Sequence, residues 1–281
     1  MFHHLLITRF NLKNSDWKFT KNNDNLLDDK WMTERMELFQ NFCLPSAVNQ
    51  TNKNFKWLIY FDNSTSDFFK NEIQKIIQNH SNILVFYIEG MPEFKSSILK
   101  YISENTKDKP YLITSRIDND DCIHKDFINE VQQKFNNQDF MAFDFIKGYT
   151  LQVEPKILLG KKEHIFNPFI SLIEKNENPK TVWHYVHNMW KKEPRVTQVT
   201  DKRIWMSIIH KKNKVNEFDG YGIIDWNSIN RDFILSEKMN ETISSTITPF
   251  RKWWLKSIRN YIGVKRVLTS KIIKRKLKYY S

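Results

Sequence analysis

Apolar residues along the first half of the chain follow two alternating patterns. Short continuous runs, bounded by polar or turn-forming residues, favour buried β-strands, and they lie at residues 3–8, 55–61, 83–88 and 111–117. Between them, apolar residues recur three and four positions apart, as Phe69, Ile73 and Ile76 do, which favours amphipathic helices. These helices are expected at residues 28–42, 66–79, 94–105 and 124–135.

Buried strands that alternate with helices predict an α/β fold with a Rossmann-type, mostly parallel sheet flanked by helices. Ligands of such sheets bind beyond the carboxyl ends of the strands. Polar clusters follow three of the expected strands, at residues 8–11, 62–65 and 116–121. We therefore expect these three segments, which are distant in sequence, to meet at one edge of the sheet.

The pattern becomes less regular after residue 138. Shorter elements are expected there: paired strands at residues 140–146 and 149–153, helices at 168–174 and 201–210, the latter capped by Asp201, and a loop at 219–229. No change of composition marks a domain boundary before about residue 235. We predict one domain over residues 1–235 and a basic, helical C-terminal extension over residues 236–281.

The positive charge of the chain is concentrated in its last segment. The net charge is +12, yet 11 of the 44 Lys and Arg residues lie within residues 250–281, which contain no Asp or Glu. The rest of the chain is nearly neutral, which disfavours a nucleic-acid-binding protein, because such a protein spreads its basic residues over the body. Apolar residues in the segment recur at helical spacing, with Gly263 as an expected break. A basic amphipathic helix of this kind suits an anionic membrane surface, and the alternative is a helix packed on the domain.

Two features bear on the compartment. Cys43 and Cys122 are the only cysteines, too few for a disulfide framework or a four-thiolate zinc site. No apolar run approaches the ~18 residues of a membrane span, and the run at residues 5–7 is too short for a signal peptide. We therefore expect a cytoplasmic protein, peripheral at the inner face of the membrane if the C-terminal segment binds lipid.

The acidic run Asp118-Asn119-Asp120-Asp121 is the strongest chemical signal. Two carboxylates two positions apart at a strand end can bind Mn²⁺ or Mg²⁺, and such an ion neutralises a leaving pyrophosphate. Asp120 or Asp121 can instead cap the helix expected from residue 124. The two roles are compatible, because one aspartate can cap while its neighbours bind metal.

Several short motifs occur along the chain in a specific order. They are Thr8-Arg9-Phe10-Asn11, Arg35-x-x-Leu38-Phe39, Leu44-Pro45-Ser46, Gln50, Phe55-x-Trp57-Leu58, Phe61-Asp62 and Ser115-Arg116-Ile117-Asp118-Asn119-Asp120-Asp121. Together they resemble the putative rhamnosyltransferase family of bacteria, well over residues 3 to about 150, loosely to about 230, and not in the C-terminal segment. The resemblance implies a GT-A-like fold, a nucleotide-sugar donor, and a DxD metal motif formed by Asp118 and Asp120, with Asp121 as an alternative ligand.

The same resemblance implies the other site residues. The donor site is expected to comprise Thr8, Arg9, Asn11, Arg35, Asp62, Arg116, Asp118 and Asn119. Asp62 would contact the nucleobase, unless it serves only an Asx-turn, and Arg9 or Arg116 would pair with a phosphate or balance the aspartates. A late histidine would complete the metal site, and we expect His187 rather than His184, although either can be a packed or surface residue.

An inverting transfer needs a general base, for which Asp144, Glu163 and Asp225 are candidates, although exposed carboxylates are common and a retaining transfer needs no such base. The predicted function is metal-dependent transfer of a sugar, rhamnose by the family's name, to a glycan or lipid-linked acceptor in surface polysaccharide synthesis. The alternatives are a noncatalytic sugar-nucleotide or carbohydrate-binding protein of the same fold and, less favoured, a nucleic-acid-binding protein. A nucleotidyltransferase is disfavoured because the chain lacks a glycine-rich phosphate loop.

Overall fold

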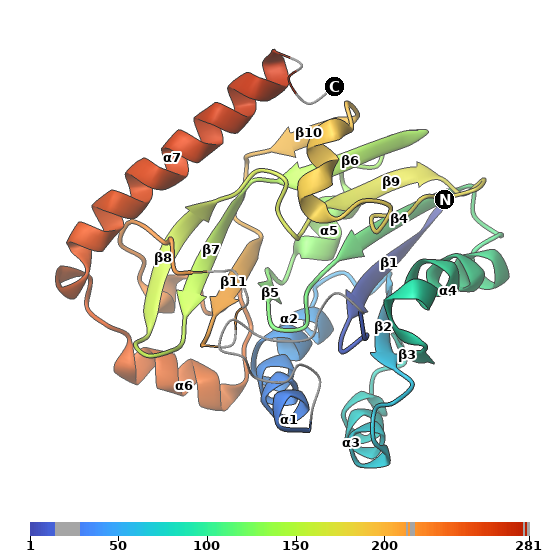
Figure 1. Cartoon of the computed structure of the whole chain (residues 1–281), viewed down its shortest axis with the longest axis horizontal. Coiled ribbons are helices and arrows are strands. Elements are labelled where there is room, and N and C mark those ends of the chain that lie inside the picture. The colour runs from blue at the N-terminus through green and yellow to red at the C-terminus, as the bar shows by residue number, and fades with distance from the viewer. Residues whose placement is uncertain (15–28, 212, 214–216, 278, 280–281) are drawn as a thin grey trace.

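The computed structural model describes residues 1–14, 29–211, 213, 217–277 and 279. A seven-stranded sheet forms the centre of the fold, a four-stranded sheet lies beside it, and a long C-terminal helix runs along one side (Figure 1). The predicted α/β architecture, with a mostly parallel sheet flanked by helices and a helical C-terminal segment, is confirmed. Asp28, where the first helix was predicted to begin, lies outside the described residues.

The seven-stranded sheet has the order β10-β6-β9-β4-β1-β2-β3. Its strands are β1 (Phe2–Arg9), β2 (Lys56–Asp62), β3 (Ile83–Ile88), β4 (Tyr111–Arg116), β6 (Phe140–Phe145), β9 (Ser171–Lys175) and β10 (Val196–Val199). The four strands predicted in the first half of the chain pair in parallel, with β1 between β2 and β4. Strand β9 is antiparallel to both of its neighbours and connects this parallel half to β6 and β10.

Helices cover both faces of this sheet, which explains why its strands are apolar at successive positions. Leu6 of β1 packs in one cluster with α1 (Asp29–Leu38), α3 (Asp67–Ile77) and the short α5 (Phe127–Gln132). The flanking residues Leu5 and Ile7 point to the opposite face and pack with α4 (Gly90–Asn105). Between α1 and β2, a π-helical turn at Phe39–Cys43 leads into α2 (Leu44–Val48).

The second sheet has the order β5-β11-β7-β8 and corrects several predictions. Its strands are β5 (Cys122–Ile123), β7 (Lys147–Gln152), β8 (Leu158–Glu163) and β11 (Trp205–Ile209). The helix predicted at 201–210 is the strand β11, and the helix predicted at 168–174 is the strand β9. Each is a short run buried on both faces, a pattern that apolar spacing alone does not distinguish from a buried helix. The strands predicted at 140–146 and 149–153 exist, but they lie in different sheets and do not pair.

The remaining elements are helical. They are the 3₁₀ turns at His187–Lys192, Trp226–Ser228 and Phe250–Lys252, then α6 (Glu237–Thr246) and α7 (Trp254–Lys276). Helix α7 continues through Gly263, so the predicted break is wrong, because this exposed glycine has nothing within 4 Å of its Cβ position and a regular helical backbone meets no obstacle there. Within the described residues, no helix is long and apolar enough to span a membrane. The boundary proposed at residue 235 stays a prediction.

Two glycines give opposite expectations for stability. A Cβ on Gly148 would lie 2.2 Å from Cδ2 of Trp205, a side chain with no exposed surface. We expect Gly148→Ala to lower the free energy of unfolding by about 1–3 kcal/mol, because the packed indole has to shift. The matched substitution Gly263→Ala should raise it by about 0.5–1 kcal/mol, because alanine favours the helix. Urea unfolding of both variants measures the difference, and equal effects of the two substitutions would contradict the packing at Gly148.

Candidate functional site

The three polar strand ends meet at one edge of the sheet, as the sequence predicted. The side-chain amide of Asn11, just after β1, accepts a hydrogen bond from the backbone N–H of Asp62 at 3.0 Å and donates to the hydroxyl of Thr65 at 2.9 Å. The side chain of Asn119, after β4, donates to the carbonyl of Phe10 at 3.1 Å. These two asparagines therefore tie the ends of β1, β2 and β4 together.

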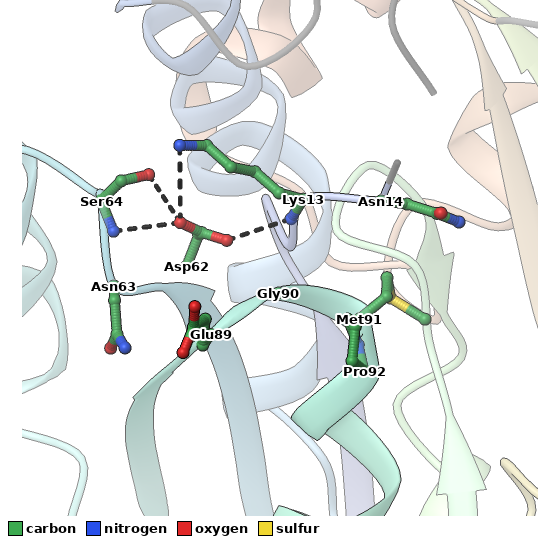
Figure 2. Close-up of a pocket in the computed structure, with 9 residues that line it drawn as sticks. All are labelled: Lys13, Asn14, Asp62, Asn63, Ser64, Glu89, Gly90, Met91 and Pro92. Atoms are coloured by element: carbon green, nitrogen blue, oxygen red, sulfur yellow. Dashed lines mark hydrogen bonds and ion pairs between the residues drawn. The ribbon is translucent and has the colours of Figure 1, made fainter. Parts of the chain in front are cut away.

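Asp62 lies at the rim of an open cavity of about 750 Å³. Its carboxylate accepts hydrogen bonds from the backbone N–H and the hydroxyl of Ser64 and from the backbone N–H of Lys13, which approach it from two sides (Figure 2). Burial alone would raise the pKa of Asp62, but the hydrogen bonds of Ser64 and Lys13 outweigh burial and lower it. Asp62 thus forms the predicted Asx-type turn and also lines a cavity, and its contact with a nucleobase stays a prediction.

The same cavity is lined on its other side by the start of α4. Gly90 and Pro92 belong to that helix, and Glu89 precedes it. Gly90 has a positive φ of 65°, and a Cβ there would lie 2.7 Å from the carbonyl oxygen of Lys13, so glycine lets the chain after β1 pass close to the helix. The cavity therefore combines a carboxylate, amide groups and a lysine with a helix N-terminus, which suits a polar ligand.

The aspartates of the acidic run have different environments. Asp118 retains 31% of its side-chain exposure and lies 3.5 Å from the guanidinium of Arg116. Asp120 is buried, and its Oδ2 lies 2.6 Å from Nη1 of Arg35 and 3.0 Å from Nε2 of His210. Although burial opposes ionisation, Arg35 and His210 hold the pKa of Asp120 well below its usual range. Asp120 is therefore a charged carboxylate held by two side chains.

The carboxylate of Asp121 has a backbone partner, whereas those of Asp118 and Asp120 contact arginine side chains. Its Oδ1 accepts a hydrogen bond from the backbone N–H of Ile208 in β11 at 3.0 Å. Burial, together with the nearby charges of Asp120 and Asp118, raises the pKa of Asp121 well above its usual range. The capping alternative is wrong, because α5 begins only at Phe127 and neither Asp120 nor Asp121 reaches its first turn.

His210 is a site residue that the sequence analysis missed. It directly follows β11 in the chain and contacts Asp120, which follows β4. The segment around it was predicted as a helix, which would have given His210 no particular direction. The available signal was a histidine at the end of a buried apolar run, the same pattern that located the acidic run.

Two arginines lie against one tryptophan. The guanidinium carbon of Arg116 lies 3.8 Å from the ring centre of Trp183, and that of Arg9 lies 5.4 Å from it. Burial lowers the pKa of Arg116 to about 10, so it remains charged at neutral pH, and Arg9 adds to this lowering by repulsion. The buried Nε of Arg116 has no hydrogen-bond partner among the described residues. Trp183, which the sequence analysis passed over, thus holds two like charges close together, an arrangement that an anion would stabilise.

The metal ligands predicted beside the aspartates are only partly brought together. Nδ1 of His187 lies 2.9 Å from the carbonyl of Phe166, so this nitrogen donates and Nε2 keeps its lone pair. Burial lowers the pKa of His187, and the nearby charge of Asp118 partly opposes this lowering. His184 instead packs against Tyr185, with the two ring planes tilted by 60°. Among the described residues, no three His, Cys, Asp or Glu side chains converge to hold a metal ion.

Asp144 is not placed to act as a general base. Its side chain has no exposed surface, and it accepts hydrogen bonds from the backbone N–H of Phe166 at 2.7 Å and the side-chain amide of Asn167 at 2.9 Å. Burial raises its pKa to about 7. The carboxylate holds the turn that follows β8, which is a structural role.

The other two candidate bases are also engaged elsewhere. Glu163 forms ion pairs with Lys265 of α7 and Arg203, so it attaches the C-terminal helix to the domain. Asp225 is exposed and caps the turn that begins at Trp226, where it accepts a hydrogen bond from the backbone N–H of Asn227. Their prediction as bases is not supported by these positions.

Comparisons with known proteins give one family and several solved structures. A family model described as "Putative rhamnosyl transferase" matches residues 2–220. No curated protein matches the chain. The TarS protein of S. aureus is 11% identical, with a TM-score of 0.43 over 74% of this chain, which spans only 37% of TarS.

Two further structures are similar in outline. A crystal structure of S. aureus TarS 1–349 in complex with UDP-GlcNAc is 12% identical, with a TM-score of 0.43 over 87% of this chain and 70% of that one. A putative nucleotide-diphospho-sugar transferase from Desulfovibrio desulfuricans G20 is 9% identical, with a TM-score of 0.36 over 75% of this chain and 82% of that one.

Thr8, predicted to line the nucleotide pocket, is instead fully buried between the strands. Its hydroxyl accepts a hydrogen bond from the indole of Trp57 and donates to the carbonyl of Ile117, both at 3.0 Å. We expect Thr8→Val to lower the free energy of unfolding by about 2 kcal/mol or more, because two buried groups lose their partner. Thr8→Ser keeps the hydroxyl and should lose only about 1 kcal/mol. Urea unfolding distinguishes them, and a valine variant as stable as the wild type would contradict this structural role.

Proposed function

The chain belongs to the putative rhamnosyl transferase family, and from this membership we propose that it is a glycosyltransferase that uses a nucleotide-sugar donor. One observation carries the proposal. The ends of β1, β2 and β4 bring Asp62, Arg116 and the acidic run to a single edge of a parallel sheet, beside an open cavity. This edge is where ligands of such sheets bind.

The two halves of a donor would find different partners at this edge. The cavity beside Asp62 offers carboxylate and amide acceptors for the base and ribose of a nucleoside. Arg116 and Arg9 would pair with the diphosphate, since both are cationic and Arg116 has a buried donor without a partner among the described residues. Trp183 would act as a positioning residue that keeps the two guanidinium groups adjacent.

The proposal includes Mn²⁺ or Mg²⁺ held by Asp118 and Asp120. The fit rests on chemistry: these carboxylate oxygens are of the type that hard cations prefer, and Asp118 is partly exposed at the strand end. His210 or His187 would supply the nitrogen, whereas Asp121 is directed to the backbone of β11. Such an ion supplies positive charge to a leaving diphosphate.

The finer parts of the proposal concern the sugar, the acceptor and the location. We take rhamnose as the first candidate sugar because of the family's description. A glycan or a lipid-linked sugar would be the acceptor, in surface polysaccharide synthesis at the cytoplasmic face of the membrane. A noncatalytic protein that binds the same donor is the second candidate.

Donor binding is testable by thermal unfolding with a panel of nucleotide-sugars that includes UDP-GlcNAc and a nucleotide-activated rhamnose. A ligand at about 100 times its Kd stabilises a protein by about 2.7 kcal/mol, so we expect one donor with Mn²⁺ to raise the Tm by about 5 °C or more. Asp118→Asn should abolish most of this shift, because the variant loses a charged oxygen ligand, and EDTA should do the same.

The exposed capping residue provides the matched control, and Asp225→Asn should shift as the wild type does. The metal–donor proposal fails if no donor raises the Tm, or if Asp118→Asn responds as strongly as the wild type. Release of nucleoside diphosphate with a glycan or lipid-linked acceptor then separates the two candidates, because a noncatalytic protein would bind the donor and release none.

A further inference from the structure

Helix α7 turns one side to the domain and the other to solvent. The outward side carries large apolar residues, with Leu255 63% and Ile262 60% exposed, although such residues are usually exposed only singly. Positions three, four and seven apart share one face of a helix. This face is here called the outer stripe, and it comprises Leu255, Ile258, Arg259, Ile262, Arg266, Thr269 and Ile273, with Leu277 just beyond the end of the helix.

The opposite side of α7 is firmly attached to the domain. The hydroxyl of Ser257 accepts a hydrogen bond from the backbone N–H of Gly222 at 2.9 Å, and the side chain of Asn260 donates to the carbonyl of Gly220 at 2.9 Å. Further along, Lys271 donates to the carbonyl of Ile165 at 3.3 Å. The orientation of α7, which runs along one side of the molecule (Figure 1), is therefore fixed, and the exposed outer stripe lies on the side of the helix away from these attachments.

The positive charge of residues 250–281 favours one kind of binding partner for the outer stripe over the others. Residues 250–281 contain 11 Lys and Arg and no Asp or Glu, and Arg259 and Arg266 lie within the stripe itself. A second copy of the chain would bring two strongly cationic helices into contact, which is unfavourable. A nucleic acid would place its phosphates against Ile258 and Ile262, which offer them no hydrogen bonds. An anionic lipid surface suits both the arginines and the aliphatic side chains of the stripe, because its headgroups pair with arginine and its acyl chains accept aliphatic side chains.

We propose that the outer stripe of α7 docks on an anionic lipid bilayer, with the helix lying in the plane of the interface. Leu255, Ile258 and Ile262 enter the boundary between headgroups and acyl chains, and Arg259 and Arg266 contact the lipid phosphates. This surface goes beyond sugar transfer and does not depend on it.

Docking would also place the candidate site near the bilayer. Lys271, on the inward side of α7, donates a hydrogen bond to the carbonyl of Ile165, and the carbonyl of the next residue, Phe166, accepts a hydrogen bond from His187. Helix α7 is therefore attached to the segment that holds His187, one of the candidate site residues, in place. A lipid-linked acceptor emerging from the bilayer would meet the protein on this side.

Cosedimentation of the full chain with vesicles tests the proposal without donor or acceptor. Vesicles of phosphatidylcholine with about 30% phosphatidylglycerol provide the anionic surface, and pure phosphatidylcholine provides the neutral one. We expect binding to the anionic vesicles that weakens as salt increases, and at least tenfold weaker binding to the neutral ones. Ile258→Ser combined with Ile262→Ser should weaken anionic binding about tenfold, and so should Arg259→Gln combined with Arg266→Gln.

Matched controls lie on the same helix and elsewhere on the surface. Val267 is 52% exposed but lies away from the stripe, so Val267→Ser should bind as the wild type does. Two exposed lysines on α1 and α4, changed as Lys30→Gln and Lys100→Gln, control for the loss of two charges. Circular dichroism confirms that each variant is folded, since all the substituted side chains are exposed.

Three results would overturn the assignment. The first is no binding of the wild type to anionic vesicles at physiological salt, and the second is unchanged binding of both stripe variants. The third is a wild-type dimer in light scattering that the isoleucine substitutions dissociate, which would assign the stripe to a second copy of the chain. Loss of binding in the stripe variants with retention in the controls would support the lipid surface, whatever the outcome of donor binding.

Discussion

The arrangement of this protein depends on β1 having a parallel partner along both of its edges. Pairing with β2 and with β4 brings three carboxyl ends to the same edge of the sheet, so residues about 50 and about 110 positions apart become neighbours. Helices cover both faces of β1, so a polar side chain within the strand is buried and is tolerated only where it has a hydrogen-bond partner. Thr8 is such an exception, because Trp57 and the carbonyl of Ile117 use its hydroxyl as acceptor and donor. The site begins immediately beyond this buried layer.

Charge is distributed unevenly across that edge. Asp120 lies against Arg35 and His210, so its carboxylate already has partners within the protein. Arg116 is less well compensated, because Asp118 lies 3.5 Å away and Arg9 repels it. A buried cation with an unused donor is costly in a medium of low dielectric constant. The positive side of the site, rather than the acidic run alone, is therefore the physical reason to expect an anionic ligand there.

The first half of the fold was predictable because two periodicities alternate cleanly there. Strand β3 was located at its exact bounds and β1, β2 and β4 to within one residue, and the meeting of three polar strand ends followed from parallel topology. The second half was not predictable in the same way. The run Trp205–Ile209 is buried on both faces, so its apolar pattern carries no strand periodicity, and its partners β5 and β7 are distant in sequence. The role of His210 depends on that tertiary pairing, and its position after an apolar run was the only signal for it in the sequence. The role of Trp183 depends on a separate tertiary contact, with Arg116.

The carboxylates predicted as bases show why residue type alone misleads. Glu163 has the chemistry of a base, but its ion pairs with Lys265 and Arg203 make it a fastening point for α7. Lys271 and Asn260 of the same helix donate hydrogen bonds to backbone carbonyls of the domain. The helix is therefore held by hydrogen bonds to the backbone as well as by ion pairs, and substitution of one side chain need not release it. A helix fixed in this way keeps its aliphatic side chains exposed to water. This exposure has an unfavourable free energy, and nothing in the isolated protein offsets it. That cost is the reason to look for the function of α7 on its outer side, and its lack of acidic residues is the reason to look for an anionic surface.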